Sequence, residues 1–76
     1  FERVYKKLPD SVKKKFKSLV PVIENNPFDD VLKTHMLQGN KFHIFSLSVT
    51  YKIRALFVIK GNTIVFSDIG NHDDLY

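Results

Sequence analysis

The chain has 76 residues, with twelve Lys and Arg against eight Asp and Glu for a formal net charge of +4, and no cysteine. Its 43 % hydrophobic content excludes a disordered chain, and no apolar run approaches the ~20 residues of a membrane span. We therefore expect one domain over residues 1–76, without disulfides or thiolate metal sites, suited to a reducing cytoplasm and biased toward polyanions or an acidic partner.

The first third of the chain predicts a helical hairpin. In "LPDSVKKKFKSLVPVIENNPF" one apolar stripe recurs at helical spacing, formed by Val12, Phe16, Leu19, Val20 and Ile23. Pro9 suits a first helical turn, whereas Pro21 should kink or interrupt the helix because it removes one backbone hydrogen bond. The preceding "FERVYKKL" predicts a shorter helix, with Val4 and Leu8 one turn apart.

The rest of the chain predicts three consecutive antiparallel strands. After "PFDDVLKTHMLQGN", expected to be irregular with one short helical turn, the apolar period changes to two in "FHIFSLSVT", "YKIRALFVIK" and "TIVFSDI". Gly61 and Asn62 are expected to supply positive φ angles in a tight turn. The middle strand should bury one continuous apolar face: Tyr51, Ile53, Ala55, Phe57 and Ile59. The predicted fold class is α+β, with the helical hairpin packed on a small, twisted antiparallel sheet.

The opposite face of that middle strand carries Lys52 and Arg54, which we expect beside Ser46 and Ser48 of the neighbouring strand. A pair of cations on a half-apolar sheet face is a candidate anion site. The alternative is that the two cations only protect the sheet from aggregation. Further along, Leu56 and Val58 are expected to form an exposed apolar patch.

The chain closes with "SDIGNHDDLY", which is either a simple end or part of an active site. We expect Gly70 and Asn71 to turn the chain sharply off the last strand and Leu75 to pack inward. His72 and Tyr76 would then face a groove. The alternatives are that His72 caps the strand, that Tyr76 plugs the core and that His35, upstream, is a solvated loop residue.

Three stretches, "LKTHMLQGN", "SVTYKIRALF" and "DIGNHDDLY", resemble in order and spacing the RelE/YafQ branch of the RelE/ParE toxin superfamily of type II toxin–antitoxin systems. The resemblance covers essentially the whole chain. It implies a metal-independent, ribosome-dependent mRNA endonuclease without a cofactor, in which a 2′-hydroxyl attacks the adjacent phosphate. It also implies that mRNA, the ribosome and a cognate antitoxin are partners, the last in a hetero-oligomer, and that no membrane is involved.

The resemblance assigns roles to four residues. His72 matches the C-terminal catalytic histidine, as general acid or base, and Tyr76 matches the terminal aromatic residue. His35 matches the histidine of an H-x-L-x-G motif, and Arg54 matches the arginine that contacts the scissile phosphate. These residue types suit the reaction, which needs a base, an acid and a cation for the extra negative charge of the transition state.

The sequence departs from the family at three places. Ser48 stands where some members have a further histidine. Lys52 stands where many have an aspartate, so that Lys52 becomes a fifth candidate and adds a cation. The strand expected before "FERVYKKLP" is missing from a sequence that begins with Phe1, which would leave one sheet edge exposed.

Two other functions stay open. A ParE-like chain would inhibit DNA gyrase without cutting RNA, and a catalytically inactive relative would only bind an antitoxin. His35, His72 and Tyr76 favour the nuclease, because ParE-like members generally lack that set.

Overall fold

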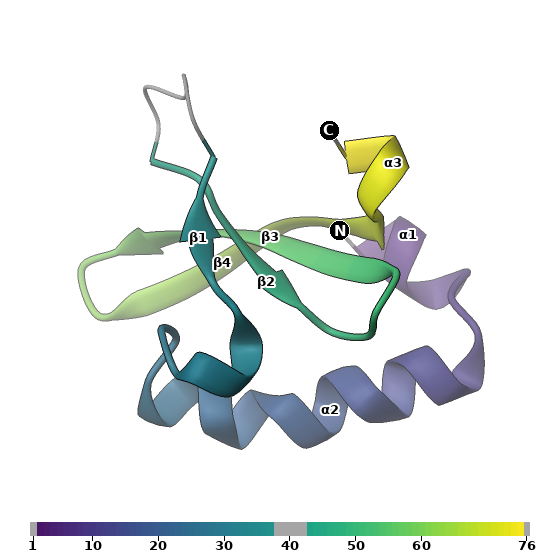
Figure 1. Cartoon of the computed structure of the whole chain (residues 1–76), viewed down its shortest axis with the longest axis horizontal. Helices are drawn as coiled ribbons and strands as arrows, with labels where there is room; N and C mark the ends of the chain where they lie inside the picture. The colour runs from purple at the N-terminus through teal and green to yellow at the C-terminus, as the bar shows by residue number, and fades with distance from the viewer. Residues whose placement is uncertain (1, 38–42, 76) are drawn as a thin grey trace.

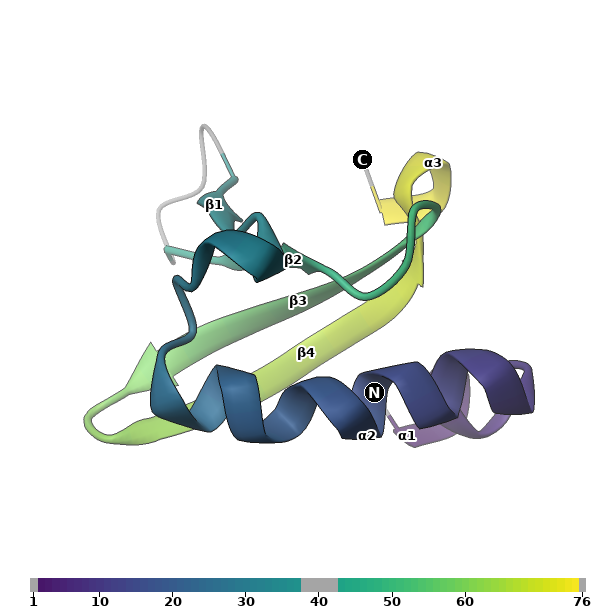
Figure 2. The ribbon, with the colours of Figure 1, turned by 60° about the horizontal axis from the view of Figure 1, so that its bottom comes forward.

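The computed structural model describes residues 2–37 and 43–75. Two N-terminal helices, α1 (Glu2–Lys6) and α2 (Asp10–Asn25), precede a short 3-10 helix, η1 (Asp30–Leu32). A four-stranded antiparallel sheet follows in the order β1 (His35–Met36), β2 (Phe45–Ser48), β3 (Ile53–Lys60) and β4 (Thr63–Asn71), and α3 (His72–Leu75) comes last. Helix α2 runs along one face of the sheet (Figure 1 and Figure 2). The predicted α+β class is confirmed.

Tyr5 ties α1 to α2. Its ring meets the edge of Phe16 at a centroid distance of 5.6 Å, and its hydroxyl donates to the Lys13 carbonyl at 3.4 Å. Phe16, Leu19 and Ile23 are the buried residues of α2, as the helical stripe predicted. The two helices therefore form the expected hairpin, and both contact the sheet. No helix within residues 2–37 and 43–75 is long and apolar enough to cross a membrane.

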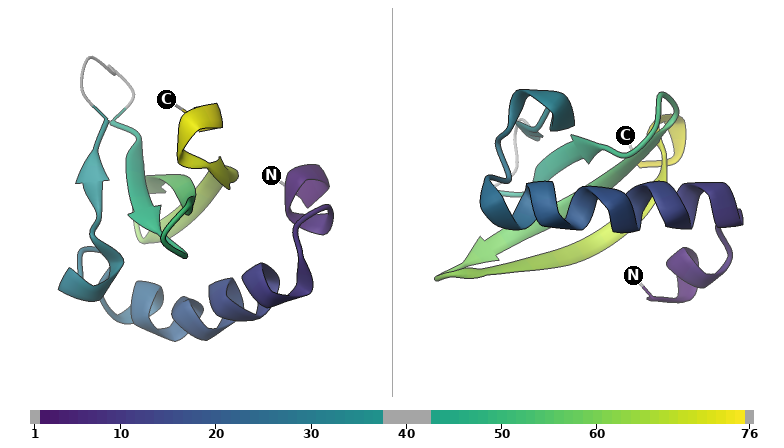
Figure 3. Two further views of the ribbon diagram at one scale, coloured as in Figure 1. Left: turned by 45° about the vertical axis from the view of Figure 1, so that its right-hand side comes forward. Right: turned by 90° about the horizontal axis from the view of Figure 1, so that it is seen from below.

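Helix α2 continues through Pro21, so the predicted interruption is wrong (Figure 3). Proline removes the hydrogen bond that would reach the Lys17 carbonyl. Pro21 and Lys17 are exposed, which leaves that carbonyl accessible to water. Leu19 and Ile23, on either side of the proline, are buried against the sheet and hold both halves in one helix.

A row of phenylalanine rings forms the centre of the core. Phe57 is fully buried between Phe45 and Phe66, at centroid distances of 5.5 and 5.9 Å. Phe66 meets Phe16 of α2 at 5.1 Å, and Phe45 meets Phe28 at 5.1 Å. These contacts link α2 to three neighbouring strands, and aromatic pairs at such distances stabilise a core beyond the area that they bury.

A bulge in β4 decides which of its side chains face α2. Leu56 pairs with Asp68 but Phe57 pairs with Phe66, so Ser67 has no partner opposite it. Phe66 and Ile69 are three residues apart and would face opposite sides of a regular strand. With the bulge both reach the core, and Gly70 lies opposite Arg54 of β3.

The faces of β3 differ from the expected pattern. The strand begins at Ile53, so Tyr51 lies in the preceding turn with 98 % of its surface exposed, and Ile59 at the far end is 40 % exposed. The predicted continuous apolar face is therefore wrong at both ends. The predicted exposed patch is also wrong, because Leu56 is buried and Val58 half-buried. The Arg54 side chain reaches β2 on this same face, where its Nε donates to Ser46 Oγ.

One strand was not predicted, and the predicted tight turn at Gly61 and Asn62 is confirmed only in part. The short strand β1 pairs through only His35 and Met36, which is too few residues for a period of two to be recognised. In the β3–β4 turn Gly61 has a φ of 60°, but Asn62 does not have a positive φ, contrary to expectation. A positive φ at the first central residue alone is the pattern of a type II′ turn.

We expected Gly70 and Asn71 to turn the chain through an unusual backbone conformation, and this prediction is wrong. Both residues belong to β4, and neither has a positive φ. The Asn71 side chain instead accepts a hydrogen bond from the Asp73 amide at 3.3 Å and caps α3. Leu75 is half-buried and packs over Gly70.

We expect Pro21→Ala to stabilise the protein. The alanine restores the backbone amide that is missing from the helix, which stabilises the folded state. It also gives the unfolded chain more conformational freedom, which opposes this gain but is smaller. The free energy of unfolding should therefore rise by about 2 kcal/mol. Urea denaturation followed by circular dichroism measures the change, with the exposed Lys14→Ala as a control near zero. An unchanged or lower stability would contradict the cost that we assign to the hydrogen bond missing at Pro21.

We expect alanine at the two glycines to have opposite effects. A Cβ at Gly70 would meet Leu75 at 3.8 Å, an ordinary contact, so Gly70→Ala should stabilise the protein by about 0.4–1 kcal/mol. Gly61→Ala meets no atom but must adopt a positive φ, so it should destabilise by about 1–2 kcal/mol. Thermal melts of the two variants measure the difference. Equal changes in stability in the two variants would contradict the claim that only Gly61 needs a positive φ.

Candidate functional site

Arg54 is held in place by the strand beside it. Its Nε donates to Ser46 Oγ at 2.6 Å, and its Nη2 donates to the Ser46 carbonyl at 3.1 Å. Ser46 is fully buried, so its hydroxyl has no access to water in the folded protein. Hydrogen bonds that involve a charged donor are short and strong. The sequence predicted Arg54 beside Ser46, and the structure confirms this neighbourhood.

The end of η1 supplies another partner of Arg54. Lys33 has a left-handed backbone conformation with a φ of 51°, and its carbonyl accepts from Arg54 Nη2 at 3.0 Å. Asp29 caps the start of η1 through the Val31 amide at 3.0 Å. A left-handed lysine is uncommon and costs free energy. The left-handed conformation of Lys33 thus directs its carbonyl toward the Arg54 guanidinium.

His35 follows on β1, opposite Ser46, and also contacts the guanidinium. Its Nδ1 lies 3.4 Å from Arg54 Nη2. Every nitrogen of a guanidinium is a donor, so Nδ1 must be the acceptor.

His72 lies on the Arg54 side of the sheet. Its amide donates to the Lys52 carbonyl at 3.0 Å, which continues the β3–β4 pairing by one step. Helix α3, which begins at His72, turns onto the face of Gly70 and Arg54, and it lies on the side of the sheet opposite α2 (Figure 2). The structure therefore places His72 away from the helical hairpin, as expected.

A second group of side chains surrounds His72. A pocket of about 500 Å³ is lined by Tyr51, Lys52, Asn71, His72 and Asp73. Asp73 Oδ1 lies 3.6 Å from His72 Nδ1. Because the Asp73 side chain is 95 % exposed, solvent screens this interaction.

The predicted site residues thus form two pairs. His35 contacts Arg54, and Lys52 contacts the start of α3 at His72. Lys52 was expected on the strand but lies in the turn before β3, because pairing with β2 ends at Arg54. Tyr76 lies outside the described residues.

We did not predict from the sequence that the Lys33 carbonyl contacts Arg54 or that Tyr51 lies in the pocket beside His72. Alternation runs without a break from Phe45 to Ile53, so no sequence signal marked the turn that exposes Tyr51. The Lys33 carbonyl is a backbone group, and its position depends on the left-handed φ, which residue type does not reveal.

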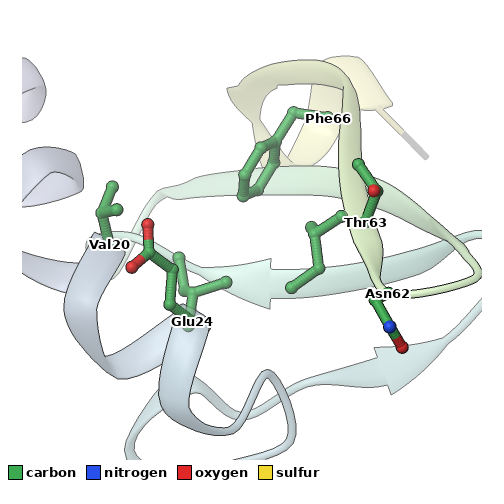
Figure 4. A pocket seen from close by; sticks show the side chains of 7 residues that line it. Val20, Glu24, Asn62, Thr63 and Phe66 are labelled. Atoms are coloured by element: carbon green, nitrogen blue, oxygen red, sulfur yellow. The ribbon is translucent and has the colours of Figure 1, made fainter.

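Another pocket, of about 400 Å³, opens between α2 and the beginning of β4 (Figure 4). Its lining is mostly apolar, with Val20, Ile64 and Phe66, and Glu24 is its only titratable residue. It lies on the α2 side of the sheet, away from Arg54 and His72. Among residues 2–37 and 43–75, no three His, Cys, Asp or Glu side chains lie close enough to hold a metal ion.

No family model and no curated protein matches the sequence. Among solved structures, this fold is similar to the crystal structure of a copper-bound mutant toxin from Helicobacter pylori. The two share 16 % identity and a TM-score of 0.65, over 99 % of this chain and 83 % of that one. At this identity the likeness shows that the two proteins share a common fold.

We expect Ser46 and Arg54 to be energetically coupled. Ser46→Ala leaves the Arg54 Nε without its acceptor, so it should lower the free energy of unfolding by about 1–3 kcal/mol. In a double-mutant cycle with Arg54→Ala, the second substitution should cost less once the first is present. Urea denaturation measures the four variants. A matched cycle with exposed Ser67→Ala should give no coupling, and additive effects at Ser46 would contradict the contact.

Proposed function

We propose that this chain is a RelE/YafQ-like toxin of a type II toxin–antitoxin system that cuts mRNA on the ribosome without a metal. One observation carries the proposal. Arg54 is a fixed cation beside His35, on the sheet face onto which α3 brings His72. The fold shared with a toxin of solved structure and the net charge of +4 also support it.

In the proposed reaction Arg54 binds the scissile phosphate. Its Nε and Nη2 are occupied by Ser46 and Lys33, whereas Nη1 makes no hydrogen bond to the residues that the structure describes. Nη1 would therefore donate to the phosphate oxygens. Because the guanidinium is already held, it would stabilise the extra charge of the transition state without reorganisation.

The two histidines would have different roles. His72, whose side chain is more than half exposed, would take the proton from the 2′-hydroxyl as that oxygen bonds to phosphorus. His35, which lies beside Arg54, would donate a hydrogen bond to the charge that develops as the bond to the 5′-oxygen breaks. The leaving 5′-oxygen takes its proton from solvent. The products are a 2′,3′-cyclic phosphate and a 5′-hydroxyl.

A cognate antitoxin is the proposed protein partner. The chain carries four more positive than negative charges, and Lys52 and His72 are exposed. An acidic segment that covers this face would block access of mRNA to Arg54. The proposed assembly is therefore a toxin–antitoxin hetero-oligomer in the cytoplasm.

We expect His72→Gln to lower mRNA cleavage by roughly 10²–10⁴-fold, the usual contribution of general acid–base catalysis. Primer extension on mRNA after induction, alongside growth, measures cleavage. The melting temperature should stay the same, because 56 % of the His72 side chain is exposed.

The matched control replaces the exposed His43, which lies outside the proposed site. His43 has a φ of 53°, so asparagine is the suitable replacement because it tolerates that conformation. His43→Asn should cleave normally. If folded His72→Gln stays fully toxic, or if induction triggers the DNA-damage response while mRNA survives, the proposed nuclease is wrong.

A further inference from the structure

We infer that Tyr51 is a stacking platform for a nucleobase of single-stranded RNA, next to the phosphate bound by Arg54. This inference rests on the proposed function and adds a substrate-binding subsite to it. The site is the pocket of about 500 Å³ formed by Tyr51, Lys52, Asn71, His72 and Asp73.

The exposure of Tyr51 is unlike that of the other large apolar side chains. Among the large apolar side chains that the structure describes, Tyr51 is 98 % exposed, whereas Val31, the next most exposed, reaches 62 %. Isolated exposed apolar residues are normal and need no explanation. Tyr51 differs because its neighbours are a lysine and a histidine that line the same pocket. An aromatic ring beside a lysine is the combination that binds the bases and phosphates of single strands.

The backbone that carries Tyr51 is held firmly on both sides. The Val49 and Thr50 amides donate to the Ile53 carbonyl at 2.9 and 3.1 Å, and the Ile53 amide donates to Thr50 Oγ1 at 3.1 Å. Ser48 Oγ also donates to the Thr50 carbonyl at 3.0 Å. The turn therefore presents the ring from a fixed position, and little backbone entropy is lost when a base stacks on it.

The same turn is joined to the proposed catalytic residue. The Lys52 carbonyl, one residue after Tyr51, accepts the His72 amide at 3.0 Å. Arg54 lies two residues further along β3, opposite Gly70. An RNA strand whose phosphate is bound at Arg54 can thus continue past His72 to Tyr51. Lys52 would meet the next phosphate, and Asp73, which also lines the pocket, lies beside His72 Nδ1.

The test measures binding separately from cleavage. The probe is a 2′-O-methyl RNA hexanucleotide that contains 2-aminopurine, which cannot be cut because its 2′-oxygens are blocked. Stacking on the tyrosine quenches 2-aminopurine fluorescence, and anisotropy of a 5′-fluorescein label at fixed salt measures affinity. Tyr51→Phe should quench and bind like the wild type. Tyr51→Leu and Tyr51→Ala should lose the quenching and bind roughly 5- to 150-fold more weakly.

The controls separate stacking from other effects. Val31→Ala removes exposed apolar surface away from the pocket and should bind like the wild type. Tyr51→Leu keeps an apolar side chain, so if it binds as tightly as the wild type, stacking is refuted. Unchanged quenching in Tyr51→Ala, or a wild type that does not bind the probe, also overturns the inference. Because Tyr51 is exposed, the variants should melt like the wild type.

Failure of this inference is distinct from failure of the proposed function. If the wild type cleaves mRNA while Tyr51→Ala binds the probe normally, only the stacking platform is wrong. If the wild type quenches the probe through Tyr51 but cuts no mRNA, the nuclease is wrong and the nucleobase site stands.

Discussion

The bulge at Ser67 is the constraint on which the rest of the structure depends. The core requires both Phe66 and Ile69, whose odd spacing in sequence would place them on opposite faces of a regular strand. One unpaired residue resolves the conflict. It also moves Gly70 to the Arg54 side, so that α3 leaves the sheet on the face opposite α2. The need to fill the core thus decides where His72 lies.

On that face, rigidity is provided by groups that do not themselves react. Ser46 is buried and Lys33 is in a left-handed conformation, and together they hold the Arg54 guanidinium. The left-handed conformation of Lys33 lowers the stability of the folded state, and the surrounding contacts maintain it. In return the guanidinium keeps one position relative to His35. Such a fixed cation suits phosphate chemistry, in which charge must be stabilised without reorganisation.

The sequence predicted the fold class and the central part of the site because both depend on simple periodicity. Helical spacing identified Phe16, Leu19 and Ile23, and strand alternation placed Arg54 beside Ser46. Pro21 misled the prediction, because a local preference is weaker than the burial of the residues on both sides of it. Tyr51 was misplaced because alternation continues through a turn that only hydrogen bonds reveal.

By itself, the sequence determined the α+β class, the helical hairpin, the order of the strands and the residue types available for chemistry. These follow from composition and from apolar periods of 3.6 and two, which are local properties of the chain. The tertiary structure alone decided the bulge, the short strand β1, the hold of Lys33 on Arg54 and the exposure of Tyr51. Each of these depends on contacts between segments far apart in sequence or on a single backbone angle, and neither is encoded in any local pattern of residue types.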